Sequence, residues 1–298
     1  MKVFAISDLH LSSAVEKPMD IFGDGWQNHF VKISEDWDKK VADGDLVLLG
    51  GDMSWGLTLE EAKPDYEQIA ALKGQKYIVK GNHDYYWSSL GKMRSNFPDF
   101  NFIQNNAYRV ESPSGKGVIV VGSRGWNIPS KDTPESEVKI YKRELIRLEL
   151  SLSYAKNLQK DGDVLIAMLH YPPFEATYQD TEVTALLEKY NVDYVLYGHL
   201  HGKSVRVTPF LSILYRNPAS NATPTAPRSH AIATKTDRIF GSTEPRPAHS
   251  IILSRKQNGN RRMNATIVLF FGSFGLIIII ESSIVNLQKR GFSLLGED

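Results

Sequence analysis

Short, wholly apolar runs recur along the first two thirds of the sequence, and they constrain its fold more than any other feature. They read VFAI, LVLL, YIV, VIVV, VLIAML and YVLY, at residues 3–6, 46–49, 77–79, 118–121, 164–169 and 194–197. Runs of this length and composition are typical of strands that are buried on both faces. A later run, LSILY at 211–215, could add one more strand.

The segments between these runs carry the marks of helices. The first shows an apolar stripe with spacings of three and four, formed by Trp26, Phe30, Ile33, Trp37 and Val41. Thr58 and Glu61 have the spacing of a capping box for a second helix. Thr133 followed by Pro134 predicts an N-cap and first position for the longest helix, and a further helix is expected at about 181–190. Strands that alternate with helices indicate a layered α/β domain.

Five of the apolar runs are followed within three residues by Asp, Asn or His. The polar residues that follow them are Asp8, His10, Asp52, Asn82, His83, Asp84, His170, His199 and His201. The carboxyl ends of strands in an open α/β sheet share one edge, where ligands bind, so these side chains are expected to converge. A single Asp or His at such a position is usually turn chemistry or a structural residue. Five such ends in one chain favour a functional site.

In this order the motifs DLH, GD, GNHD, LH and GHLH resemble those of the calcineurin-like metallophosphoesterase family. The resemblance extends from residue 3 to about residue 208, and the chain looks closer to the compact bacterial-type phosphohydrolases of the family than to its phosphoprotein phosphatases. It implies a four-layer α/β/β/α sandwich with a dinuclear metal centre that holds two divalent ions.

Carried over position by position, the resemblance assigns the metal ligands. One ion would be bound by Asp8, His10 and His201, the other by Asn82, His170 and His199, with Asp52 bridging both. Imidazole and carboxylate ligands suit manganese, iron, zinc or nickel, so the identity of the metals stays open.

Three further residues have expected roles beside the metals. His83 would be catalytic, donating a hydrogen bond or a proton to the leaving-group oxygen. Asp84 is expected to hold its loop or His83 in place. Arg124, in GSRGWN, is a candidate for phosphate binding, with a surface or salt-bridged arginine as the alternative.

The implied activity is metal-dependent hydrolysis of a phosphomonoester or a phosphodiester. A hydroxide that bridges the two metals would attack phosphorus in line. Where phosphoprotein phosphatases carry G-D-x-V-D-R-G, this chain reads GDMSWG, and Trp55 replaces the aspartate that pairs with the catalytic histidine. A small-molecule phosphoester or a nucleotide is therefore a more fitting substrate than a phosphoprotein.

Two other functions fit the sequence less well. A non-catalytic scaffold for protein–protein binding is the alternative, but such members of the family lose metal ligands or the histidine of GNH, and this chain keeps them. A nuclease acting on double-stranded DNA would usually bring a capping domain, and none is evident before the tail. Residues 1–210 hold 24 basic and 29 acidic residues, which does not indicate a dedicated nucleic-acid-binding surface.

The composition changes after about residue 216, which predicts three parts. Residues 1–216 would form the metallophosphoesterase domain, 217–262 a disordered, basic, low-complexity linker, and 263–298 a hydrophobic segment with a short tail. Residues 263–280 carry no charge over 18 positions, so a membrane tail anchor is the alternative to a non-catalytic extension. The lack of cysteine and of a signal-peptide core predicts a cytoplasmic protein.

Overall fold

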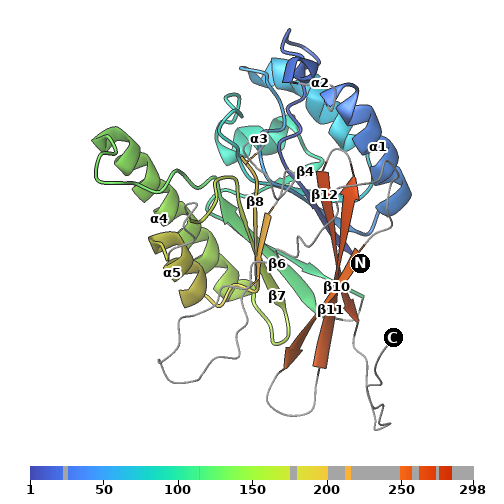
Figure 1. The fold of residues 1–298 in the computed structure, drawn as a ribbon, viewed down its shortest axis with the longest axis vertical. Coiled ribbons are helices and arrows are strands. Elements are labelled where there is room, and N and C mark those ends of the chain that lie inside the picture. Colours follow the sequence, from blue (N-terminus) through green and yellow to red (C-terminus); the bar gives the residue numbers. More distant parts are fainter. Residues whose placement is uncertain are drawn as a thin grey trace, which may run out of the picture.

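Two sheets form the centre of the structure, a computed structural model (Figure 1). The chain is described over residues 1–22, 26–113, 115–174, 180–200, 212–215, 249–256, 262–272 and 275–283. The first sheet is parallel, in the order β1 (Val3–Ile6), β2 (Leu46–Leu49), β3 (Gln75–Ile78), β4 (Phe100–Phe102). The second has the order β5 (Tyr108–Glu111), β6 (Gly117–Ser123), β7 (Val164–Leu169), β8 (Tyr194–Tyr197), β9 (Ser212–Tyr215). Strands β6, β7 and β8 are parallel, and β5 and β9 pair antiparallel to their neighbours.

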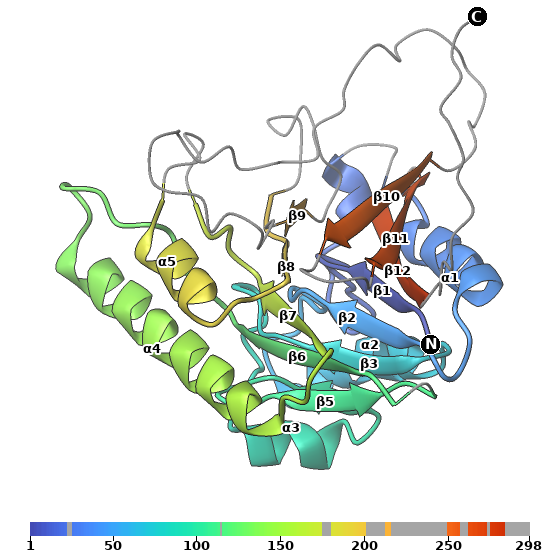
Figure 2. The same ribbon diagram turned by 90° about the horizontal axis from the view of Figure 1, so that it is seen from below.

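Helices connect the strands and cover the outer faces of the sheets. They are the short 3-10 helix η1 (Met19–Phe22) and the α-helices α1 (His29–Lys40), α2 (Leu59–Ala70), α3 (Leu90–Asn96), α4 (Glu135–Leu158) and α5 (Glu182–Lys189). Figure 2 shows α4 and α5 on the outer side of the second sheet, with α1 on the opposite side of the molecule.

Three apolar clusters follow from this arrangement. The first packs side chains of α1, α2 and α3, such as Trp37, Tyr66 and Met93, against one face of the first sheet. The second lies between the two sheets and includes Val3, Leu48, Val79, Val120, Ile166 and Leu196. The third packs α4 and α5 against the second sheet. Alternate residues of one strand therefore enter different clusters, which explains why β1, β2, β7 and β8 are apolar throughout.

Most of the predicted elements are confirmed, with one shift of a helix start. Each of the six apolar runs forms or overlaps a strand, and 212–215 forms β9. Thr58 and Glu61 form a capping box at α2. The N-cap of α4 is Pro134, one residue later than predicted, because the Thr133 hydroxyl instead accepts a hydrogen bond from the backbone N–H of Ser130. The sequence patterns missed α3, β4 and β5, which are short.

Near the C-terminus, three strands form a separate antiparallel sheet. They are β10 (His249–Lys256), β11 (Arg262–Gly272) and β12 (Gly275–Ser283), and β12 lies beside β1 (Figure 2). β10 falls within the stretch 217–262 that was expected to be a linker, and β11 and β12 hold most of the apolar segment 263–280. The division into domain, linker and tail stays a prediction. In the described part of the chain, no helix combines the length and apolarity needed to cross a membrane.

The packing of α4 gives a matched pair of substitutions. Leu152 is fully buried against the second sheet, whereas Leu150, on the same helix, is 49% exposed. Leu152→Ala should lower the free energy of unfolding by about 2–5 kcal/mol, because it removes apolar contacts and leaves a cavity. Leu150→Ala should change it by less than about 0.5 kcal/mol. Urea denaturation followed by circular dichroism measures both, and equal effects would contradict this packing of α4.

Candidate functional site

The strand ends of both sheets bring most of the predicted site residues together. Asp8 and His10 follow β1, Asp52 follows β2, Asn82 and His83 follow β3, His170 follows β7, and His199 follows β8. A hydrogen bond of 3.0 Å from the His199 backbone N–H to Asp8 Oδ2 joins the two sheets at this point. His201, predicted as a ligand with Asp8 and His10, lies outside the described residues.

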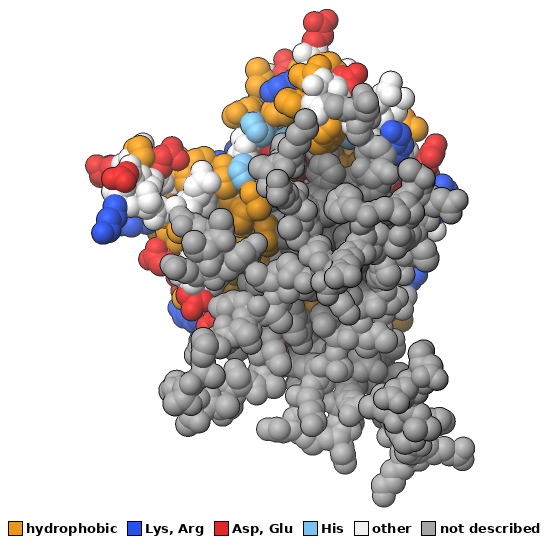
Figure 3. Space-filling model, viewed as in Figure 1, with side chains coloured by type: hydrophobic (Ala, Val, Ile, Leu, Met, Phe, Trp, Pro, Cys, Tyr) orange, Lys and Arg blue, Asp and Glu red, His pale blue; other side chains and the backbone are white. Residues whose placement is uncertain are grey.

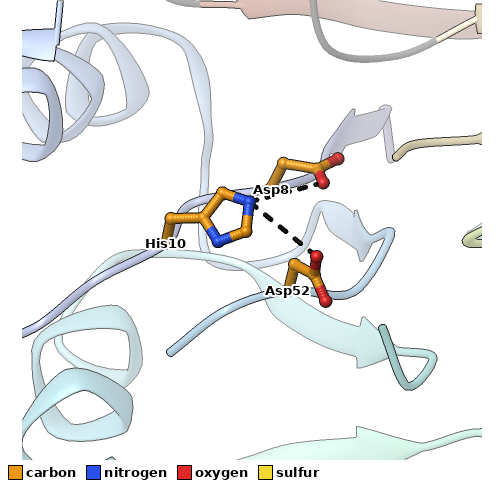
Figure 4. A group of neighbouring side chains, drawn as sticks. All are labelled: Asp8, His10 and Asp52. Atoms are coloured by element: carbon orange, nitrogen blue, oxygen red, sulfur yellow. Dashed lines mark ion pairs between the residues drawn. The ribbon is translucent and has the colours of Figure 1, made fainter. Parts of the chain in front are cut away.

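Asp8, His10 and Asp52 form one buried group that could hold a metal ion. His10 Nε2 lies 3.7 Å from Asp8 Oδ1 and 3.8 Å from Asp52 Oδ2 (Figure 4). One potential ligand atom from each residue lies within 4.8 Å of the others. All three side chains are almost completely buried, a position that carboxylates occupy only with a partner of opposite charge or a metal.

Asn82, His170 and His199 form a second group beside the first. Asn82 Oδ1 lies 2.6 Å from His170 Nε2 and 2.8 Å from His199 Nδ1. His170 Nε2 is also 3.4 Å from Asp52 Oδ2. That oxygen is buried and accepts no hydrogen bond from the described residues, yet it faces a ring nitrogen of each group. Asp52 is thus placed between the two groups.

The backbone is strained at the same positions. Positive φ angles occur at Asp8 (58°), His10 (48°), Asp52 (57°) and His199 (70°). Elsewhere in the described chain, the only non-glycine residues with positive φ are asparagines, which share with Asp and His a higher tolerance for this conformation. Such strain persists where the surrounding structure imposes it, typically at functional sites.

Two glycines allow the strand ends to approach each other. A Cβ on Gly81 would lie 2.0 Å from Asp52 Oδ1, and a Cβ on Gly198 would lie 2.6 Å from Asp8 Oδ2. Glycine directly before Asn82 and before His199 is therefore a requirement of space, because any side chain would displace a carboxylate of the buried group.

The carboxylate of Asp84 ties the loop after β2 to the loop after β3. It is fully buried and accepts hydrogen bonds from the backbone N–H groups of Asp52 (3.0 Å), Met53 (2.9 Å) and Gly81 (2.6 Å). The Tyr86 hydroxyl donates a fourth, of 2.6 Å. Burial raises the pKa of Asp84, and the neighbouring Asp52 carboxylate raises it further. The hydrogen bond from Tyr86 to Asp84 was not predicted from the sequence, although the two residues are only two positions apart.

The electrostatics of the site centre on Asp52 and His170. Burial raises the pKa of Asp8 to about 7, although the charge on His170 opposes this rise. Burial alone would lower the pKa of His170, but the Asp52 carboxylate raises it to about 9. Burial alone would raise the pKa of Asp52, yet His170 and His10 hold it below its usual range. A proton on His170 thus balances Asp52, and a metal ion bound by His170 would have to displace it.

His83 lies against aromatic rings at the edge of this centre. Its backbone N–H donates a hydrogen bond of 2.7 Å to Asp52 Oδ1, and its ring centroid is 4.5 Å from that of Trp55. His83 Nδ1 is buried without a hydrogen-bond partner in the described chain, and burial lowers the pKa of this histidine. Trp55 stacks on His10 at 4.6 Å and carries the ammonium of Lys17 over its ring at 3.3 Å. Figure 3 shows histidine side chains beside hydrophobic ones on the face of the molecule seen in that view.

Arg124 is placed next to the site through its backbone. Its carbonyl accepts hydrogen bonds from the backbone N–H groups of His170 and Tyr171. Its side chain donates to Glu144 Oε1 at 3.3 Å and lies over the Trp126 ring at 4.3 Å. Arg124 therefore has the salt bridge that was one of its two predicted environments. The salt bridge from Arg124 to Glu144 was not predicted from the sequence. A charged residue on the apolar face of α4 is a sign that it pairs with another buried charge.

Comparisons with known proteins agree with the motifs. A sequence model of the calcineurin-like phosphoesterase family matches residues 1–203. No curated protein sequence matches the chain. Among solved structures, the chain is similar to a protein of unknown function from Aquifex aeolicus, AQ665, at 18% identity and a TM-score of 0.31, over 57% of this chain and 80% of that one. The family match alone carries the assignment, and it covers well over half of the sequence: the chain belongs to the calcineurin-like phosphoesterase family.

Proposed function

We propose that this protein hydrolyses a phosphomonoester or a phosphodiester of a small molecule or nucleotide at a dinuclear metal centre. Membership of the family and the buried group of Asp8, His10 and Asp52 support a metal-dependent phosphoesterase. The observation that carries the dinuclear centre is the position of Asp52, whose buried Oδ2 faces a ring nitrogen of each group. The three apolar clusters support the four-layer sandwich that the family resemblance implies.

The donor set fits divalent cations. Asp8, His10 and Asp52 would hold one ion, and Asn82, His170 and His199 the other, with Asp52 shared and His201 as a further proposed ligand. Oxygen and imidazole nitrogen donors suit manganese, iron, zinc or nickel. When bound, such ions polarise a phosphoryl oxygen and make a coordinated water more acidic.

Protonation of the leaving group and positioning of the metal ligands would be carried out by side chains of this protein. The backbone N–H of His83 donates a hydrogen bond to the Asp52 carboxylate, and the His83 ring packs against Trp55. Together these contacts hold the ring at the edge of the centre. There it would donate a hydrogen bond or a proton to the leaving-group oxygen. Asp84 would keep Asp52 and the GNHD loop in register through three backbone hydrogen bonds. A non-catalytic scaffold would have no need of a strained backbone around buried carboxylates.

The central test is Asp52. Asp52→Ala should abolish both metal binding and hydrolysis of chromogenic phosphoesters in the presence of manganese, because it removes the carboxylate shared by the two groups. Elemental analysis and a rate assay measure the two losses. Asp36→Asn, a change on α1, is the matched control and should retain both. Full activity of the Asp52 variant, together with a wild-type protein insensitive to chelators, would refute the proposal.

His83 should separate catalysis from metal binding. His83→Ala should keep the metal content of the wild type but lose about 10²–10⁴-fold in rate, the usual range for general acid–base catalysis. The loss should be smaller for nitrophenyl esters, whose leaving group needs little protonation. Tyr85→Ala is the control, since its side chain is largely exposed. Loss of metal in the His83 variant would contradict the assigned role.

Substitution of Asp84 should change the affinity for metal rather than the rate of the chemical step. Asp84→Asn places an NH₂ group opposite backbone N–H donors, so the two loops should separate. Metal affinity, measured by competition with a chelator, should fall about 10–100-fold, as for other groups that orient metal ligands. Tyr86→Phe removes only one of the four hydrogen bonds and should have a smaller effect. An Asn variant that binds metal as tightly as the wild type would exclude this positioning role.

A further inference from the structure

A small pocket lies beside the candidate centre, along the same edge of the sheets. It is lined from the ends of β3, β4 and β6 and from α4 by residues that include Lys80, Gln104, Asn105, Arg124, Glu144 and Arg147. The centre occupies the ends of β1, β2 and β3 and of β7 and β8. The pocket is therefore displaced by one or two strands, about 5–10 Å.

The charges that line this pocket do not balance. Lys80, Arg124 and Arg147 contribute three cations, whereas Glu144 is the one carboxylate among the lining residues. Glu144 is buried and accepts hydrogen bonds from Arg124 (3.3 Å) and Arg147 (2.8 Å). One carboxylate is thus shared by two guanidinium groups, and the formal charge of the lining is positive.

Two of the cations keep donors that nothing in the described chain satisfies. Arg124 Nε is buried and has no hydrogen-bond partner there. Lys80 is half-buried, and in the described chain Asp84 and Glu144 act on its ammonium only as nearby charges, without a hydrogen bond or a salt bridge. Removing such donors from water is costly unless an acceptor or a counter-charge joins them.

Neutral groups of the pocket add to this excess of donors. Gln104 Oε1 accepts a hydrogen bond of 3.0 Å from Trp87 Nε1. The opposite end of the same amide is an NH₂ group, so Gln104 can offer the pocket donors as well. The ammonium, guanidinium and amide donors of this lining outnumber its one carboxylate. Donors of these kinds match the oxygen atoms of a phosphate or sulfate group.

We propose that this pocket binds a small oxyanion, a phosphate group, through Lys80, Arg124 and Arg147. The anion has two possible sources, free inorganic phosphate or a second phosphate group of the substrate. Binding of the anion does not depend on the proposed function, but its assignment to the substrate rests on it.

Competitive labelling of lysines tests the pocket directly. The purified full-length protein is acetylated with and without sulfate, and mass spectrometry measures the labelling of Lys80 and of Lys139, which is 72% exposed on α4. Sulfate should protect Lys80 and leave Lys139 unchanged. Equal labelling of Lys80 with and without sulfate would overturn the proposal.

A matched pair of arginines on α4 separates the pocket from nearby charge. Arg147 lines the pocket, whereas Arg143, one turn earlier, lies 3.9 Å from Glu144 but is not among the lining residues. Arg147→Gln should raise the sulfate concentration needed for protection about 10–100-fold, the effect of losing a hydrogen bond to a charged group. Arg143→Gln should not. Equal effects of the two variants would show only non-specific attraction of anions.

The source of the anion is decided by kinetics. If the pocket takes a second phosphate of the substrate, Arg147→Gln should raise KM for a nucleoside bisphosphate and not for the matching monophosphate. If it takes free phosphate, the variant should weaken inhibition by phosphate and leave both KM values unchanged. A protein inactive on both nucleotides would count against the proposed function alone, because the labelling result does not depend on turnover.

Discussion

The hydrogen bonds that Asp84 accepts fix the relative position of two loops that are far apart in the sequence. Three backbone N–H groups, from Asp52, Met53 and Gly81, converge on one buried carboxylate. Each hydrogen bond to a charged group contributes about 1.5–3 kcal/mol, enough to hold a short loop in a conformation that it would not adopt alone. The geometry of Asp52, and with it the arrangement of both groups of the proposed centre, depends on this carboxylate.

The positive φ angles show what this arrangement costs. Asp8, His10, Asp52 and His199 each occupy a backbone conformation that costs a non-glycine residue about 1–3 kcal/mol, even though Asp and His adopt it more readily than most. The three apolar clusters and the parallel strands hold these residues in place. In return, the side chains at the strand ends turn towards one another, which an unstrained extension of the strands would not allow. The strained backbone of the site therefore depends on the rigid packing around it.

The sequence was sufficient to predict the strands that carry the site, and less sufficient for the contacts around it. The six apolar runs could be identified because these strands contribute side chains to apolar clusters on both faces of a sheet. After five of these runs, an Asp, Asn or His within three residues marked the edge where the groups meet. α3, β4 and β5 were missed because they are short and their patterns are weak. The partners of Asp84 and Arg124 depend on which loops meet in space, and no local pattern contains that information.

Opposite charges gather in two separate clusters along the edge of the sheets. The carboxylates of Asp8, Asp52 and Asp84 gather at the ends of β1, β2 and β3, whereas Lys80, Arg124 and Arg147 gather around the ends of β3 and β6. No salt bridge joins the two clusters among the described residues, although Lys80 and Asp84 are only four positions apart in the sequence. His170 offsets only part of the charge of the first cluster, and Glu144 offsets only one cation of the second. The first cluster therefore suits metal cations and the second, by our proposal, an oxyanion. A molecule with two phosphate groups would satisfy both demands, because one group can face metal ions while the other meets the basic pocket.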